Sequence, residues 1–180
     1  MDETKKDAGH DEVGHLFEIT RCFRNGMLAT IAEDGHLHGR PMAIIDVDAD
    51  AHAIWFMTLL ENESCAEIAK DPRAMVTLQD DKAYVQWSGR ASLVDDPAKV
   101  AELFSPALKL WFPDGPGDPE IVLVRVDVEI GEYWDQRGGL QIRTMVRRAK
   151  DAIQGRRADE AKDDPKEHAR VHFENGHRAS

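Results

Sequence analysis

The dipeptide Asp34-Gly35 is the feature that most constrains the fold of this chain. It separates two apolar runs, "MLATIA" and "HLHGRPMAIIDVD". Between such runs, Asp-Gly is the dipeptide most typical of a tight hairpin turn. We therefore predict that residues 27–32 and 36–48 form two antiparallel strands.

Four more strands and three helices are predicted from hydrophobic periodicity and composition. The strands are expected at 53–60, 74–80, 83–94 and 120–135, and the helices at 13–23, 65–71 and 96–112. Strand and helix do not alternate as they do in a parallel sheet, which favours an antiparallel barrel or sandwich. The predicted fold is mainly β (α+β): a six-stranded antiparallel barrel flanked by helices. Because a small barrel fills its own interior, a ligand would bind on its outside or between subunits.

Proline and glycine mark three interruptions within these elements. Pro72 is expected to stop the second helix, because the residue before a proline disfavours helical backbone. Pro106 must break or bend the third helix. Gly89, inside a predicted strand, indicates a β-bulge or a close backbone approach.

The charge of the chain argues against polyanionic partners. It has 23 Lys and Arg against 34 Asp and Glu, a formal net charge of −11. Such a chain repels nucleic acid and anionic lipid, so neither nucleic acid nor a membrane is expected as a partner. No stretch approaches the roughly 18 apolar residues of a membrane span, and the charged start lacks the apolar segment of a signal peptide. We therefore expect a cytoplasmic protein.

Composition divides the chain into one domain and two flanking segments. Residues 1–11 are expected to be a flexible N-terminus, and residues 12–137 a single folded domain. Residues 138–180 form a charged C-terminal segment, in which 140–157 is predicted to be a short basic helix. The remaining residues, 158–180, are too polar to offset their ordering entropy by burial, and we expect a mobile tail.

Three stretches resemble one known family. They are "GMLATIAEDGHLHGRPM", "IWFMTLLENESCAEIAKDPRAMVTLQD" and "LWFPDGPGDPEIVLVRVDVEIGEYWD". In this order they are similar to the pyridoxamine 5'-phosphate oxidase-related flavoproteins, and most of all to the general stress protein branch, over roughly residues 12 to 136. The resemblance implies an FMN-binding split β-barrel. It also implies a homodimer with two flavins in symmetric clefts at the dimer interface.

The resemblance also implies roles for five residues of two strands. Arg40 is the residue that approaches the FMN phosphate, while Pro41 and Met42 run along the flavin through their backbone. Met57 and Thr58 match a pair that touches the flavin ring and the phosphate. A guanidinium offers paired donors to phosphate, and a threonine hydroxyl can donate a further hydrogen bond. The alternatives are a solvated arginine at a strand start and a threonine that simply favours strands.

Ser64 is a departure from the family pattern. Many relatives carry at this position a lysine that neutralises phosphate charge, whereas here Glu61, Glu63 and Glu67 lie close by in sequence. Ser64 can donate through its hydroxyl or start a helix whose amides face an anion. Simple helix capping is the equally weighted alternative.

Three aromatic residues complete the implied cofactor site. Tyr84 lies on the strand that edges the flavin in relatives, and Trp111 and Trp134 match signature positions from which a partner subunit stacks near the flavin ring. Large aromatics also occupy cores and dimer interfaces, and that alternative stays open.

The sequence assigns no metal site and no catalytic acid or base. His36 and His38 form an HxH pair on a turn, but a third ligand of known proximity is missing. Cys22 and Cys65 match no CxxC spacing and are interpreted as ordinary thiols.

The resulting hypothesis is an FMN protein that passes electrons from a reduced nicotinamide to an unknown small-molecule acceptor. The alternative is a non-catalytic module that binds a flavin, a deazaflavin or haem for storage or redox sensing. Pyridoxamine 5'-phosphate oxidation itself is not expected, because the basic substrate-binding signature of the true oxidases is not evident after "EYWD".

Overall fold

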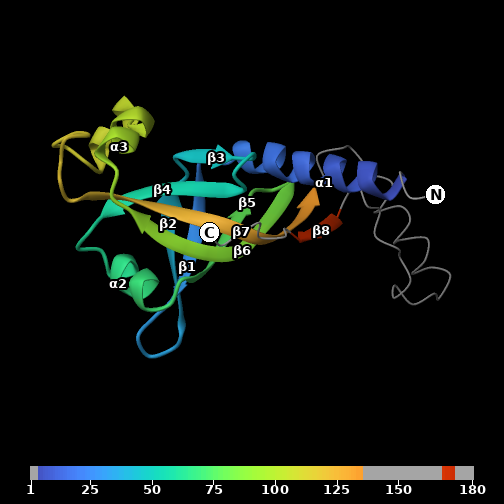
Figure 1. Cartoon of the computed structure of the whole chain (residues 1–180), viewed down its shortest axis with the longest axis horizontal. Coiled ribbons are helices and arrows are strands. Elements are labelled where there is room, and N and C mark those ends of the chain that lie inside the picture. The colour runs from blue at the N-terminus through green and yellow to red at the C-terminus, as the bar shows by residue number, and fades with distance from the viewer. Residues whose placement is uncertain (1–3, 136–167, 173–180) are drawn as a thin grey trace, which may run out of the picture.

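One curled antiparallel sheet forms the body of the protein (Figure 1). The computed structural model describes residues 4–135 and 168–172. The sheet has eight strands in the order β2-β1-β5-β6-β7-β4-β3, with β8 paired to β7. The helix α1 lies at one end of the sheet, and α2 and α3 lie at the other (Figure 1). The mainly β fold with flanking helices is confirmed.

The strands and helices have the following bounds. The strands are β1 (Asn25–Ile31), β2 (Leu37–Ala43), β3 (Asp46–Asp48), β4 (Ala53–Leu59), β5 (Arg73–Gln79), β6 (Ala83–Val94), β7 (Ile121–Asp135) and β8 (His168–His172). The helices are α1 (Thr4–Arg21), α2 (Glu63–Lys70), α3 (Pro97–Leu103) and the short 3-10 helix η1 (Pro106–Leu110). None of the helices in the described part of the chain is long and apolar enough to cross a membrane.

The hairpin predicted from Asp34-Gly35 is present between β1 and β2. Ile31 pairs with Leu37, and Gly35 has a φ angle of +84°, a conformation that glycine adopts without a steric penalty. The Asp34 side chain accepts a hydrogen bond from the backbone N–H of His36 at 3.0 Å. Local turn chemistry was therefore sufficient to predict this part of the topology.

The predicted count of six strands is wrong in two places. Residues 36–48 form two strands, because the chain leaves β1 after Ala43 and joins β4 at Asp46. The residues between them bond to different neighbours: Ile44 donates to the Arg24 carbonyl and Ile45 to the Trp55 carbonyl. Residues 36–48 are divided into β2 and β3 because they pair with two different strands, β1 and β4, and the side-chain pattern does not show this.

The strand β8 is the second correction. Residues 168–172, expected to belong to a mobile tail, pair with residues 130–134 of β7. This pairing satisfies backbone groups and does not need apolar side chains, so a polar composition did not indicate it. The helix α1 also begins earlier than expected, at Thr4. The predicted basic helix at 140–157 lies outside the described residues.

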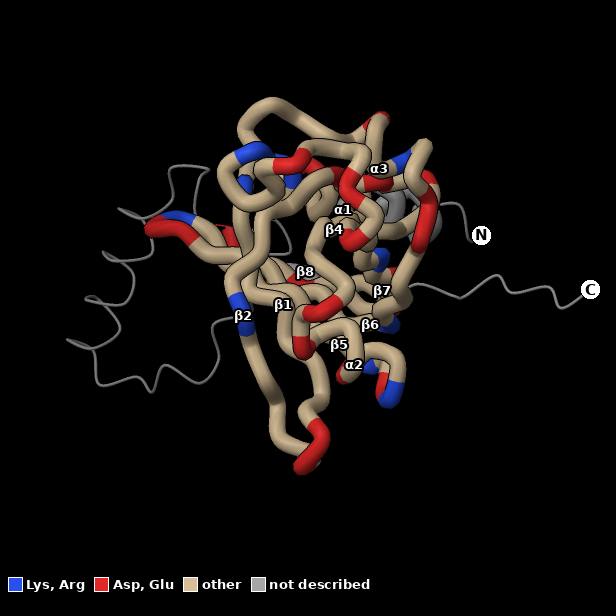
Figure 2. The backbone as a smooth tube through the Cα atoms, turned by 90° about the vertical axis from the view of Figure 1, so that its left-hand side faces the viewer, with Lys and Arg blue, Asp and Glu red and all other residues tan. Residues whose placement is uncertain are grey.

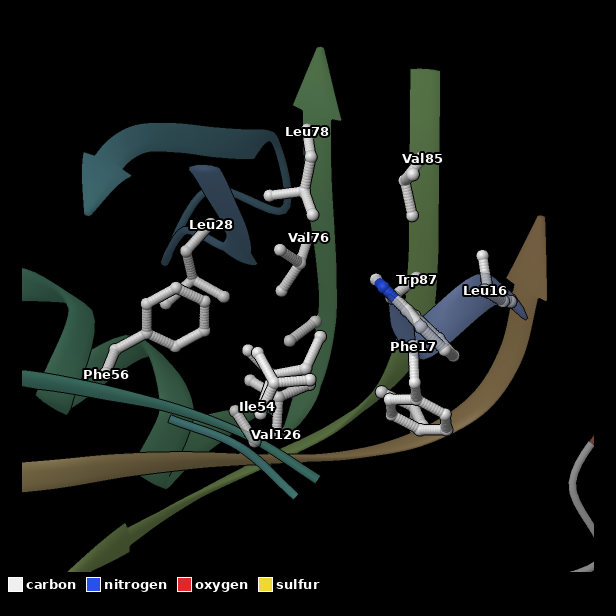
Figure 3. Packing of buried hydrophobic residues seen from close by; sticks show 14 of the residues in the cluster. Leu16, Phe17, Leu28, Ile54, Phe56, Val76, Leu78, Val85, Trp87 and Val126 are labelled. Atoms are coloured by element: carbon white, nitrogen blue, oxygen red, sulfur yellow. The ribbon is translucent and has the colours of Figure 1, made fainter. Parts of the chain in front are cut away.

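The main core fills the concave side of the sheet (Figure 3). Phe17 and Trp87 pack with their ring centroids 4.8 Å apart, and both side chains are fully buried. The Trp87 indole donates to the Thr20 hydroxyl at 3.0 Å, and that hydroxyl donates to the Leu16 carbonyl at 2.8 Å. These contacts dock α1 against the sheet without leaving the indole N–H unpaired.

The strand β4 is buried on both faces. Ile54 and Phe56 belong to the main core, whereas Trp55 and Met57 belong to a second cluster with residues of α3 and η1. Packing on both faces explains why this strand reads as a continuous apolar run rather than an alternating one. It also holds the end of β4, with Thr58, in a rigid setting.

The proline and glycine predictions are confirmed. The helix α2 ends at Lys70, two residues before Pro72, and the predicted third helix is broken into α3 and η1 at Pro106. The pairing of β6 with β7 shifts register between Ser88 and Gly89. A Cβ atom at Gly89 would lie 2.0 Å from the Asp127 carbonyl oxygen, so the bulge also brings two backbones together.

Replacing Gly89 with alanine is expected to destabilise the fold by about 2 to 3 kcal/mol, because backbone and not a flexible side chain occupies the space. The matched control is Gly39→Ala, another strand glycine, whose nearest neighbour to a new Cβ is the Met27 methyl at 3.4 Å. Urea unfolding of both variants measures the difference. Equal stability of the two variants would contradict the close approach.

Candidate cofactor site

A pocket opens at the end of the sheet where β2, β4, α2 and η1 meet. Its volume is about 790 Å³, within the range of small-molecule sites. Six of the nine residues predicted for the cofactor site line it: Arg40, Pro41, Met42, Met57, Thr58 and Trp111. The structure therefore brings together residues from two strands that are far apart in the strand order.

The other three predicted residues do not line this pocket. Ser64 is fully buried, and its hydroxyl donates to the Asn62 side chain at 2.9 Å. Asn62 is the N-cap of α2, so the capping role considered for Ser64 is wrong. Tyr84 and Trp134 are paired across β6 and β7. They lie toward the opposite end of β7 from Val122, which pairs with Thr58.

Arg40 is held by a carboxylate on α2. Its Nη2 atom donates to Glu67 Oε2 at 2.6 Å and lies 2.9 Å from His38 Nδ1. The Thr30 hydroxyl donates to the same Glu67 oxygen at 2.5 Å, and His38 Nδ1 lies 2.9 Å from Glu67 Oε1. The Arg40 side chain is only 16% exposed. The predicted phosphate ligand thus has an ion-pair partner of its own.

The other terminal nitrogen of Arg40 lacks a partner. Nη1 is buried and makes no hydrogen bond to any residue in the described part of the chain. A buried guanidinium N–H without an acceptor is costly, and such groups in native proteins call for an explanation. Arg40 lines the pocket, so its guanidinium is the charged group that could pair with an anionic ligand there.

The partnership of Arg40 with Glu67 was missed by the sequence analysis. A signal was present: Ser64, Glu67 and Ile68 are spaced at i, i+3 and i+4, and all three are buried. A carboxylate on the buried face of a helix requires a charged or hydrogen-bonding partner. The sequence could have indicated that need, but not that Arg40 meets it.

Opposing effects set the pKa of the Glu67 carboxyl. Burial alone would raise it, but the hydrogen bonds from Thr30, His38 and Arg40, together with the positive charge of Arg40, lower it from 4.5 to about 2. Glu67 is therefore ionised at neutral pH, and the pair with Arg40 is a true ion pair.

The pocket itself is weakly acidic. Among its lining residues, Arg40 is the only basic one, and Glu61 and Glu63 oppose it. Figure 2 shows Lys and Arg scattered among Asp and Glu, with no continuous basic band on the described chain. The pocket can therefore bind one anionic group at Arg40, but it does not supply a second cation for that group.

The two histidines of the HxH motif have different surroundings. His36 pairs with Asp34 on the hairpin, whereas potential ligand atoms of His38, Glu63 and Glu67 lie within 4.8 Å of one another. Glu63 and Glu67 are thus the neighbouring potential metal ligands of His38 that the sequence did not indicate. Glu67 already accepts hydrogen bonds from Thr30 and Arg40, however, and the guanidinium opposes a cation there.

The curled antiparallel sheet matches the split-barrel fold, and a pocket of small-molecule size lies where β2, β4, α2 and η1 meet. The chain belongs to the pyridoxamine 5'-phosphate oxidase like family, whose model matches residues 11–159. This confirms the family resemblance seen in the sequence.

Solved structures of the general stress group have the same fold. One from Jannaschia sp. CCS1, assigned as a general stress protein 26, is 27% identical, with a TM-score of 0.68 over 91% of this chain and 99% of that one. The general stress FMN/FAD binding protein of Xanthomonas citri is 25% identical, with a TM-score of 0.62 over 73% of this chain and 93% of that one.

A curated relative is longer than this chain. The protein bli-3 of Neurospora crassa is 25% identical over 134 residues, which are 69% of this chain and 62% of that protein. The chain thus spans less than two thirds of the length of this relative.

Replacing Glu67 with glutamine is expected to lower the free energy of unfolding by about 1 to 3 kcal/mol at neutral pH, because Arg40 loses its ionic partner. Because the pKa of Glu67 is lowered in the folded state, its contribution is fully present above pH 4.5 and is lost as the pH falls toward 2. Urea unfolding of both proteins at several pH values measures this. A stability difference that is constant from pH 7 to pH 2.5 would contradict the ion pair.

Proposed function

We propose that the protein is an FMN-binding flavoprotein, with the flavin phosphate bound at Arg40. The observation that carries this proposal is that Arg40, the one basic residue among those lining a pocket of suitable size, is held there by Glu67 and keeps a buried terminal nitrogen, Nη1, without a partner in the described chain. Membership of the pyridoxamine 5'-phosphate oxidase like family supports a flavin. A similar solved structure is described as an FMN/FAD binding protein, which supports it further.

The residues of the pocket fit a phosphorylated flavin. The Arg40 guanidinium would donate to a phosphate oxygen, and the buried Thr58 at the end of β4 offers a hydroxyl for a second bond. Pro41 and Met42 supply the wall formed by β2, and Met57 supplies apolar surface from β4. When bound, the flavin supplies the chemistry of two-electron transfer, while the chain binds and orients it.

Ser64 affects the expected strength of binding. A relative with lysine here has a second cation for the phosphate, whereas the Ser64 hydroxyl is bonded to Asn62. Losing one charge-assisted hydrogen bond costs about 1.5 to 3 kcal/mol. The backbone N–H and the hydroxyl of Ser64 both donate to Asn62, so in our proposal Ser64 holds the start of α2 beside the pocket and gives the phosphate no charge.

We further propose a homodimer with the flavin sites at its interface. Leu110 and Trp111 are 80% and 59% exposed beside the pocket, which is apolar surface that a second copy would cover. Tyr84 and Trp134 are exposed away from this pocket. They would join a flavin site only across the interface, from the partner subunit.

The proposed activity is electron transfer from a reduced nicotinamide to a small-molecule acceptor. A second candidate is flavin binding without turnover, for storage or redox sensing. The charge of the pocket favours the second candidate, because Glu61 and Glu63 repel the phosphates of a nicotinamide dinucleotide. Only a kinetic experiment separates the two.

Wild-type protein titrated with FMN should quench flavin fluorescence, and Arg40→Ala should weaken binding by about 10- to 100-fold, the value of one charge-assisted bond. The control is Arg73→Ala. Arg73 is 69% exposed, pairs with Asp71 and lies outside the pocket, so its removal should leave the affinity unchanged. Equal binding by wild type and Arg40→Ala would refute the phosphate role.

The electron-transfer candidate predicts that the FMN-loaded protein, mixed with NADPH without oxygen, loses its visible flavin absorbance faster than free FMN does. Addition of oxygen or a quinone should then restore the absorbance. The rate of this recovery measures electron transfer from the reduced flavin to the acceptor. Reduction by dithionite but not by NADPH or NADH would leave the binding function and rule out nicotinamide-dependent turnover.

A further inference from the structure

The Arg40 side chain is oriented by residues behind the pocket. Glu67 contributes one oxygen, Oε2, which accepts from both Arg40 and Thr30. Its other oxygen, Oε1, lies 2.9 Å from His38 Nδ1. A carboxylate facing an arginine is often bidentate. Here the two oxygens serve different partners, so only one terminal nitrogen of the guanidinium is used.

Glu67 is itself held in a rigid position. It lies on α2 between buried residues Cys65 and Ile68, and Ile68 packs in the main core. The Cys65 thiol donates to the Leu59 carbonyl at the end of β4, which joins the helix to the strand that carries Thr58. Thr30 is fully buried on β1. Glu67 is therefore held in place by the contacts of α2 with β4 and by the hydrogen bond from Thr30 of β1.

This arrangement has a cost that stability alone does not explain. An ion pair that served only the fold would satisfy both terminal nitrogens of Arg40, because a buried donor without a partner is destabilising. Instead, Nη2 is anchored by Glu67, and Nη1 is buried without a partner in the described chain. Such strain is expected where a group is preorganised for a ligand.

We propose that Glu67 is the positioning residue that holds the Arg40 guanidinium at the pocket, and that it thereby sets a preference for phosphorylated flavin over riboflavin. This inference rests on the proposed FMN function. Riboflavin differs from FMN only by lacking the phosphate ester, so their affinity ratio reports on the phosphate contact alone. Without the bond to Glu67, Arg40 can adopt other rotamers. Binding of FMN must then also order the Arg40 side chain, which weakens the affinity for FMN.

Charge and geometry predict opposite effects of changing Glu67. Its negative charge repels a phosphate, so a purely electrostatic role predicts that FMN binds more tightly once the charge is removed. A positioning role predicts weaker binding even where the charge is kept. Glu67→Asp separates the two, because it keeps the carboxylate and withdraws it from Arg40 by one methylene.

The experiment measures the dissociation constants of FMN and riboflavin for each protein by fluorescence quenching. In Glu67→Asp we expect the preference for FMN to fall at least 10-fold, with the riboflavin affinity unchanged within 2-fold. Thr30→Val keeps the shape of Thr30 and removes the hydroxyl that fixes Glu67, and it should lower the preference in the same direction by a smaller factor. Thermal unfolding shows that each variant is folded.

The matched control is Glu33→Asp, the same change at an exposed carboxylate that pairs with Lys70 of α2 and lies outside the pocket. Its preference for FMN should equal that of the wild type. A wild-type preference retained in Glu67→Asp, or an equal loss in the control, overturns the positioning role alone. A wild-type protein that binds riboflavin as tightly as FMN overturns the proposed phosphate site, and this inference with it.

Discussion

The link between β2 and β3 is the constraint on which the rest of the structure depends. These strands stand at the two ends of the strand order, yet only Ile44 and Ile45 join them. Ala43 and Asp46 are three residue steps apart, which span about 11 Å at most, so the two edges of the sheet must lie close together at this point. The sheet therefore curls. The curl encloses the main core and brings β2 next to β4, which is where the pocket forms.

The curl also decides the electrostatics of the pocket. It brings Arg40 on β2 against α2, which follows β4, so that Glu67 can hold the guanidinium from behind. A buried ion pair contributes little net stability, because desolvation offsets its attraction. The ion pair instead orients the Arg40 guanidinium: Nη2 is bonded to Glu67, and Nη1 has no partner in the described chain. The proposed phosphate site and the proposed role of Glu67 both follow from this division.

Features of the fold that depend on neighbouring residues were predicted well, whereas features that depend on pairing with distant strands were not. Gly35 and Gly89 act through their own backbone geometry, so the hairpin and the bulge could be predicted from neighbouring residues. The strand β8 depends on pairing with β7 across many residues of intervening chain. Its own composition carries no sign of that pairing. The break at Ile44 has the same cause, since two different neighbouring strands impose it.

By itself, the sequence determined most of the strand runs, the turns and the residues of the proposed flavin site, including Arg40 and Thr58. The tertiary structure alone decided which of these residues meet. It placed Trp111 at the pocket and left Trp134 at the far end of β7, and it buried Glu67 against Arg40. The physical reason is range: turns and strand propensities arise between neighbours in sequence, whereas an ion pair requires two distant segments to be folded together.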